Sequence, residues 1–135
     1  MTNYFVRYLL LLLPTILISC KDGFDKELER EAKEFTTNRC PIEVESGTTL
    51  DSLTYDPNRR IYTSYYSLNG TNEPFYSSNA PLLHQMLLQR LKSSADYKDI
   101  KAAKVTFGFI YISKTDGHTV YHTEIGPVEY EVNKQ

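Results

Sequence analysis

A hairpin pattern near the C-terminal end constrains the fold more than any other feature of this sequence. Two runs rich in β-branched and aromatic residues, 104–113 and 119–127, flank the pair Asp116-Gly117. Asp-Gly between two such runs is typical of a two-residue type I′ turn, so we expect a β-hairpin with Tyr111 opposite His122. Both faces of the first strand are apolar, which predicts that it lies inside a sheet with material packed over each side.

Two stretches have the spacing of amphipathic helices. In residues 22–36, apolar side chains recur at i, i+4, i+8 and i+11, which is one face of a 3.6-residue period. The second stretch, residues 79–95, opens with a cap residue followed by a proline in the first turn, and its apolar face is broad. We expect this second helix to cover one face of the sheet. The apolar residues of the first helix are Phe24, Leu28, Ala32 and Phe35.

The remaining strand candidates complete the expected fold. Residues 48–55 and 60–68 are rich in Thr, Tyr, Ile and Leu, residues 42–44 suggest a short edge strand, and residues 129–132 suggest a last one. Residues 69–78 are expected to form a polar loop. The order helix-strand-strand-helix-strand-strand predicts an α+β fold, with an antiparallel sheet of about four strands packed with two helices.

The first 19 residues have the layout of an export signal peptide. A short region carrying Arg7 precedes an uncharged, mainly apolar run from Tyr8 to Ile18. This run is too short to span a bilayer, because a transmembrane helix needs about 20 residues. Removal of residues 1–19 would leave residues 20–135, a length suited to a single small domain.

The apolar run ends in Leu17-Ile18-Ser19-Cys20, which resembles the lipobox of bacterial lipoproteins. The resemblance implies cleavage between Ser19 and Cys20 and attachment of lipid, palmitate included, to the Cys20 thiol. Each buried CH₂ contributes about 0.8 kcal/mol, so several acyl chains on one cysteine anchor a protein stably. We expect a lipoprotein of the bacterial cell envelope, held at a membrane through Cys20. The alternative is an ordinary secretory signal that happens to contain a cysteine.

A second resemblance lies just after the first predicted helix. Cys40-Pro41-Ile42-Glu43-Val44, followed by Thr48-Thr49-Leu50, is similar to a pattern of small exported bacterial proteins, in which a Pro-x-x-Val segment leads into a Thr-x-Leu strand. The resemblance covers under a quarter of the chain. It implies a small domain facing the periplasm and carries no activity with it.

The charge and the titratable residues do not indicate an enzyme or a nucleic-acid-binding protein. Without residues 1–19 the chain loses only the charge of Arg7. It then has 14 basic and 17 acidic side chains, a net charge of −3. A nucleic-acid-binding surface is instead typically basic. His118 and His122 are about 13 Å apart along a strand, too far to share a metal ion. Cys40 and one of these histidines are the only candidates for a catalytic nucleophile and its base. A free cysteine is more commonly a small buried apolar residue. We expect no catalytic residue, metal or cofactor.

Phe107, Phe109 and Tyr111 form an aromatic stripe on one face of the expected hairpin. The first helix or a partner protein is expected to cover this stripe. If the chain itself covers the stripe, it is part of the core. If the stripe is exposed, it marks an interaction face. These observations favour a non-enzymatic envelope lipoprotein that binds an envelope protein or has a structural role, through this face or an open strand edge. Two alternatives stay open: a small-ligand or lipid-binding module with a cavity between the second helix and the sheet, and an enzyme that uses Cys40.

Overall fold

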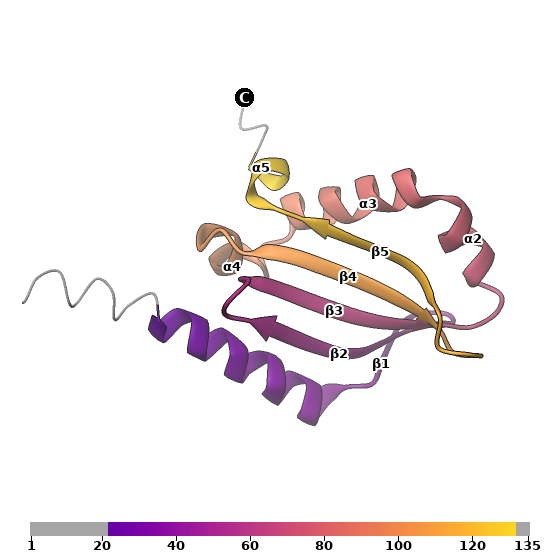
Figure 1. Cartoon of the computed structure of the whole chain (residues 1–135), viewed down its shortest axis with the longest axis horizontal. Helices are drawn as coiled ribbons and strands as arrows, with labels where there is room; N and C mark the ends of the chain where they lie inside the picture. The colour runs from indigo at the N-terminus through magenta and orange to yellow at the C-terminus, as the bar shows by residue number, and fades with distance from the viewer. Residues whose placement is uncertain (1–21, 132–135) are drawn as a thin grey trace, which may run out of the picture.

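The computed structural model describes residues 22–131. The predicted signal peptide, its cleavage site at Ser19 and Cys20, and the predicted lipid attachment at Cys20 lie outside these residues. A helix over residues 22–39 opens the described chain. The elements that follow are β1 (Ile42–Glu45), β2 (Thr48–Asp56), β3 (Ile61–Leu68), α2 (Glu73–Ser78), α3 (Ala80–Ser93), α4 (Lys98–Ala102), β4 (Thr106–Ser113), β5 (Thr119–Ile125) and α5 (Pro127–Tyr130), as Figure 1 shows.

The five strands form one sheet in the order β1-β2-β3-β4-β5. Neighbouring strands are antiparallel, except that β3 and β4 run parallel with Ile61 opposite Thr106. Parallel neighbours need a long crossover connection, and the chain supplies one in α2, α3 and α4. The α+β class is confirmed, and the sheet is antiparallel as expected except for the β3–β4 pair. The sheet has five strands rather than about four because Ile42–Glu45 pairs with β2 as a full edge strand.

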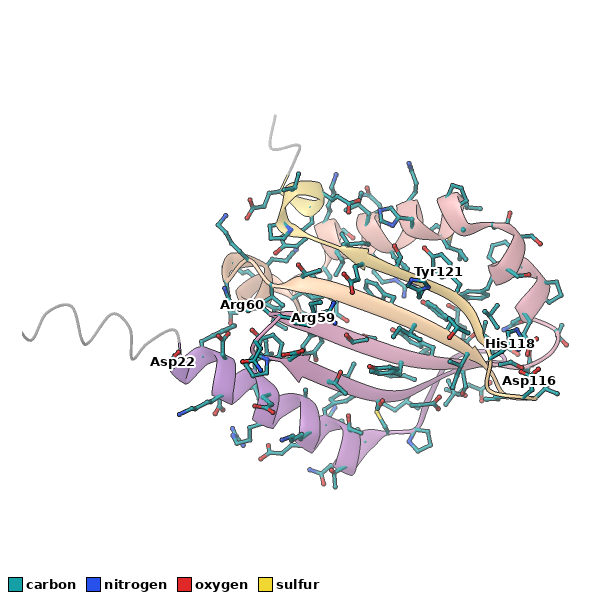
Figure 2. The ribbon with its side chains drawn as sticks, viewed as in Figure 1. Asp22, Arg59, Arg60, Asp116, His118 and Tyr121 are labelled. Carbon is teal, nitrogen blue, oxygen red and sulfur yellow. The ribbon has the colours of Figure 1, made fainter. Side chains whose placement is uncertain are left out.

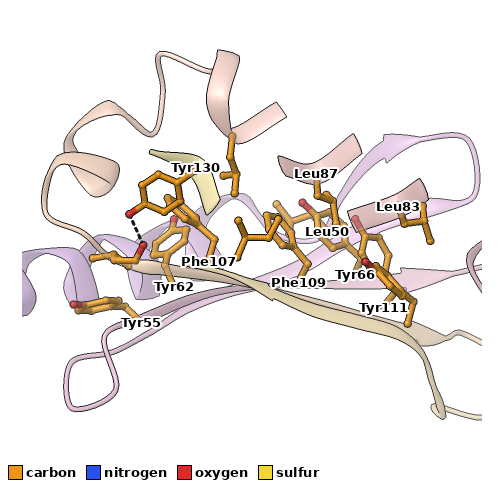
Figure 3. Packing of buried hydrophobic residues seen from close by; sticks show 14 of the residues in the cluster. Leu50, Tyr55, Tyr62, Tyr66, Leu83, Leu87, Phe107, Phe109, Tyr111 and Tyr130 are labelled. Atoms are coloured by element: carbon orange, nitrogen blue, oxygen red, sulfur yellow. Dashed lines mark hydrogen bonds between the residues drawn. The ribbon is translucent and has the colours of Figure 1, made fainter. Parts of the chain in front are cut away.

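The aromatic stripe of β4 lies in the core. Phe107, Phe109 and Tyr111 are only 2%, 5% and 4% exposed, and they pack in one cluster with Leu83 and Leu87 of α3 (Figure 3). We expected α3 to cover the face of the sheet opposite the aromatic stripe, and this was wrong. Phe107, Phe109 and Tyr111 lie on one face of β4 because alternate residues of a strand share a face, and α3 lies over that face. Within the described residues, all buried apolar residues of the cluster lie between residues 28 and 130.

The helix over residues 22–39 joins the same core from the side of β2. Leu28 and Ala32 are buried, as the helical period predicts. Near its first turn the Tyr55 hydroxyl donates a hydrogen bond to Asp25 Oδ1 at 2.7 Å, and Arg60 Nη2 lies 3.4 Å from the same oxygen. The start of this helix is thereby attached to the β2–β3 turn.

The hairpin of β4 and β5 forms, but with a different register. Tyr111 pairs with Tyr121, one residue away from the expected His122. The two-residue turn was wrong: four residues, 114–117, lie between Ser113 and His118, which are joined by a hydrogen bond of 2.9 Å from Ser113 N to His118 O. The register shifts again between Tyr111 and Ile112, where β5 has one extra residue. Gly117, with φ of 77°, is the last loop residue. Because the side-chain period of a strand is two, this shift turns Tyr121 into the core.

Three short helices lie where the sequence predicted none. Within the expected polar loop of residues 69–78, α2 begins with Pro74 in its first turn, and α4 forms at Lys98–Ala102. The last strand expected at residues 129–132 was wrong, since Pro127–Tyr130 is helical, again with a proline in the first turn. Proline has no N–H to donate to a strand ladder and suits the first turn of a helix.

Candidate binding groove

An open groove of about 420 Å³ lies between α2, α3 and the turn that joins β1 to β2. Its apolar lining comes from both helices: Phe75 and Tyr76 of α2, and Leu83, Met86 and Leu87 of α3. Glu45 and Arg90 contribute charged side chains to it. We refer to this feature below as the α2–α3 groove.

The floor of the α2–α3 groove is an aromatic cluster centred on Tyr111. The Tyr111 ring stacks on Tyr66 with centroids 4.7 Å apart and planes 10° apart, and it also contacts Tyr76 at 4.7 Å. Burial raises the pKa of Tyr111 and of Tyr76 above the ordinary tyrosine value, so both hydroxyls stay neutral at physiological pH. The floor is therefore a packed aromatic surface without charge.

Hydrogen bonds connect the β1–β2 turn to the start of α2. Asn72 Nδ2 donates to Ser46 O at 2.9 Å and to Thr48 Oγ1 at 3.1 Å. Asn69 N donates to Gly47 O at 2.9 Å, and Asn69 Oδ1 accepts from Asn72 N at 3.1 Å. Two segments far apart in the sequence are thus held at a fixed separation. A binding site whose walls are already in place loses less conformational entropy when it is occupied.

Large apolar side chains stay exposed at the groove. Phe75 is 46% exposed and Met86 is 50% exposed, and both line the groove. Leu82, one helical turn before Met86 and outside the groove lining, is as exposed as Met86. Clustered apolar surface of this kind on a small protein is typical of an interaction site. The sequence carried a signal for it: the apolar face of α3 is too broad for a single buried stripe of Leu83, Leu87 and Leu91.

The structure separates the predicted interaction residues. Tyr111 forms part of the groove floor, whereas Phe107 and Phe109 have no place in the groove lining and are buried in the core. Phe107 instead packs edge-on against Tyr62, Tyr97 and Tyr130. Of the two alternatives for Phe107, Phe109 and Tyr111, the structure shows the core and not an exposed interaction face, because α3 and its neighbours cover the stripe.

Cys40 does not meet a histidine. It precedes β1, at one edge of the sheet, whereas His122 lies on β5 at the other edge. Four interstrand spacings separate those edges, about 19 Å. Burial, followed by the nearby charge of Asp51, raises the pKa of the Cys40 thiol. A raised pKa disfavours the nucleophilic thiolate.

The other histidines have structural contacts. His84 bridges three elements: Nδ1 lies 2.7 Å from Thr123 Oγ1 on β5, and Nε2 lies 2.6 Å from Glu129 Oε2 on α5. His118 Nδ1 lies 2.5 Å from Asp116 Oδ1 in the hairpin loop. This loop lies at the opposite end of the molecule from Asp22 (Figure 2). Within residues 22–131 no three His, Cys, Asp or Glu side chains gather as a metal site would require. The same part of the chain holds no helix long and apolar enough to cross a membrane.

Three solved structures share this fold. A candidate secreted protein of Pseudomonas aeruginosa aligns with 82% of this chain and 95% of its own, with a TM-score of 0.71 and 15% identity. The pilotin EpsS of the Vibrio vulnificus type 2 secretion system aligns over 84% and 96%, with a TM-score of 0.65 and 9% identity. The type II secretion system pilotin AspS of Vibrio cholerae aligns over 84% and 97%, with a TM-score of 0.61 and 8% identity. At such identities the similarity shows a common fold.

Sequence comparison gives a family match as well. A family model described as a domain of unknown function (DUF8479) matches residues 23–121. The match runs from the first helix into β5 and includes every element that lines the α2–α3 groove. No curated protein matches the sequence.

Proposed function

Since this chain belongs to a family of domains of unknown function, we propose its role from the α2–α3 groove. The protein is a non-enzymatic lipoprotein of the bacterial cell envelope that binds a segment of another envelope protein in this groove. The observation that carries the proposal is the exposure of Phe75 and Met86 beside a packed aromatic floor. Apolar and aromatic side chains of this kind form the centre of most protein interfaces.

The comparisons support the envelope setting. Two of the three similar folds are pilotins of secretion systems, and the third is described as a candidate secreted protein. The fold alone does not carry function from one protein to another. The proposal therefore rests on the groove, and the neighbours support the choice of compartment.

Anchoring through Cys20 would fix the direction in which the groove faces. Only Lys21 separates Cys20 from Asp22, the first described helical residue, so the tether spans at most about 7 Å. The helix over residues 22–39 is about 27 Å long at 1.5 Å per residue. It starts at the end of the molecule opposite α2 (Figure 1). On this proposal the anchored protein presents its groove away from the membrane surface.

A small apolar ligand is a second candidate occupant. The groove volume of about 420 Å³ falls in the range of ligand pockets, about 300–1,000 Å³, and the groove lies between α3 and Tyr111 of the sheet. An environment-sensitive apolar dye distinguishes the two functions. Saturable dye binding to residues 21–135 that Met86→Asp abolishes, together with no protein partner in cells, would favour the ligand.

Cross-linking in intact cells tests the protein-binding function. The tagged full-length protein is compared with Phe75→Asp and Met86→Asp, and with Val128→Asp, which changes an exposed apolar residue on α5 outside the groove. We expect one envelope protein to be captured by the parent and by Val128→Asp, and lost with both groove variants. Equal capture by all four proteins would exclude the groove as the binding site.

Membrane attachment needs its own variant. Cys20→Ala should remove the incorporation of a labelled fatty acid and move the protein out of the membrane fraction. Incorporation that survives Cys20→Ala would contradict the lipoprotein assignment without affecting the groove. The two parts of the proposal are thus tested separately.

A further inference from the structure

Two charged side chains of opposite sign line the α2–α3 groove without an ion pair. Glu45 lies in the β1–β2 turn wall and Arg90 in the α3 wall, and both are exposed. None of the ion pairs among residues 22–131 includes either of them. The groove therefore has an acidic wall and a basic wall.

Both charges act on the floor between them. Tyr76 and Tyr111 are influenced by each: after burial, which dominates, the Glu45 carboxylate raises the pKa of the two tyrosines and the Arg90 guanidinium lowers it. An occupant above these rings would experience the same two opposite fields.

Arg90 is aligned with the apolar residues of α3. It lies four positions after Met86 and seven after Leu83, so the three side chains follow one another along one helical face. An apolar stripe that ends in a charge matches a partner with the same arrangement: apolar residues along the centre and a charge at the edge.

The geometry favours a helix over a strand as the occupant. The backbone N–H and C=O groups of α2 and α3 are hydrogen-bonded within each helix. These walls can therefore contact an occupant through side chains, but they cannot form backbone hydrogen bonds with an added strand. The free edge of β1 is poorly suited to strand addition, because it has only four residues, is irregular between Glu43 and Glu45, and is acidic. Recognition of an amphipathic helix in a groove needs side-chain contacts alone.

We propose that the α2–α3 groove selects an amphipathic helix whose apolar stripe is bordered by an acidic residue on one edge, facing Arg90, and a basic residue on the other, facing Glu45. This inference rests on the proposed function and names the chemistry of the partner segment. The two charges determine which segment binds, and the apolar lining supplies the affinity.

Three designed peptides test it. Each is about 16 residues long, enough for about four helical turns, carries the same leucine stripe and a fluorescent label, and differs only at its edges: Asp on one and Lys on the other, Asp on both, or Lys on both. Fluorescence anisotropy measures their binding to residues 21–135. We expect the mixed peptide to bind about three- to fivefold more tightly than either of the others, the size expected of exposed charge pairs.

Charge reversal must change the preference. Arg90→Glu should prefer the peptide with Lys on both edges, and Glu45→Lys the peptide with Asp on both. Lys98→Glu on α4 has the same net charge as Arg90→Glu and should keep the preference of the parent, which separates local from overall charge. A preference that stays the same in both reversal variants would overturn the inference while leaving the groove as a binding site.

Failure of the proposed function gives a different result. Peptide binding that Met86→Asp does not weaken would place the peptides outside the groove and overturn the helical occupant. If no peptide binds the parent, the helical occupant is also wrong, and the capture experiment with Phe75→Asp and Met86→Asp decides independently whether the groove binds a protein.

Discussion

Thr36 on the helix of residues 22–39 bonds both backbone groups of Leu53 on β2. Its Oγ1 donates to Leu53 O at 2.9 Å and accepts from Leu53 N at 2.8 Å. β1 pairs with β2 only at residues 48–50, so Leu53 lies where β2 has no strand neighbour on that side. The helix covers the open edge in place of a strand, one of the ways in which proteins protect sheet edges.

Replacing Thr36 with valine should destabilise the fold while keeping the side-chain shape. Valine lacks the hydroxyl, so the Leu53 N–H and C=O lose their partner in a part-buried place. Lost hydrogen bonds of this kind cost about 1–3 kcal/mol. Urea unfolding of residues 21–135 measures the change. Thr37→Val, at the exposed neighbouring position, is the control and should stay within about 0.5 kcal/mol of the parent.

The two apolar rows of α3 should respond differently to truncation. Leu91 is buried at the end of the core-facing row, whereas Leu82 is half-exposed on the outer row. Leu91→Ala leaves a cavity and should cost about 2–5 kcal/mol, and Leu82→Ala should cost less than about 0.5 kcal/mol. Thermal unfolding of both variants checks the order. Equal losses would contradict the assignment of one row to the core and one to the surface.

Alkaline pH should unfold the protein through its tyrosines. Burial raises the pKa of Tyr130 to about 12 and also raises the pKa of Tyr62 and Tyr111. The unfolded chain releases these protons near its ordinary pKa of about 10, whereas the folded chain retains them. The contribution of Tyr130 is therefore fully present below about pH 10 and is lost as the pH rises through about 12. The contributions of Tyr62 and Tyr111 start to fall at the same pH and continue to fall above it. Urea unfolding across this range measures the loss.

Tyr111→Phe provides the control for the alkaline effect. Phenylalanine keeps the stacked ring and removes the titrating hydroxyl, so the pH dependence above about pH 10 should become shallower by up to about 1.4 kcal/mol per pH unit. An unchanged slope would mean that Tyr111 ionises equally easily in the folded and unfolded chains.

A methyl group at Gly47 should disturb the acidic wall of the groove. Gly47 has φ of 79°, in the left-handed region, and a Cβ there would collide with the side-chain amide of Asn69. The left-handed conformation alone costs a residue with a Cβ about 1–2 kcal/mol. Gly47→Ala should therefore destabilise the fold by more than that and weaken peptide binding. Gly70→Ala, where a Cβ meets no atom within 4 Å, should do neither.

The sequence predicted the elements whose pattern is local. The helix of residues 22–39 and α3 follow a 3.6-residue period, and β2, β3, β4 and β5 follow strand composition between turn residues, so each was placed within a few residues. The short helices α2, α4 and α5 were missed because elements of six, five and four residues are too short to show a helical period. Pro74 and Pro127 in the first turns of α2 and α5 were the available signals.

Long-range arrangement could not be predicted from the same signals. The parallel pairing of β3 with β4 depends on how the crossover helices pack. The hairpin register depends on a four-residue loop, which Asp116-Gly117 alone does not specify, and on an irregularity between Tyr111 and Ile112. The groove required both: Tyr111 becomes its floor only because α3 covers the aromatic stripe, and Glu45 reaches it only through the bonds of Asn72 to the β1–β2 turn. Predicting these contacts required knowledge of the tertiary structure.

Site-specific photo-cross-linking in intact cells directly tests whether the α2–α3 groove binds a protein. A photoreactive amino acid replaces Met86 in the groove or Val128 on α5, two exposed apolar positions at different places on the surface. We expect one cross-linked envelope protein at Met86 and none at Val128. No adduct at Met86, or the same adduct at both positions, would contradict a binding function of the α2–α3 groove.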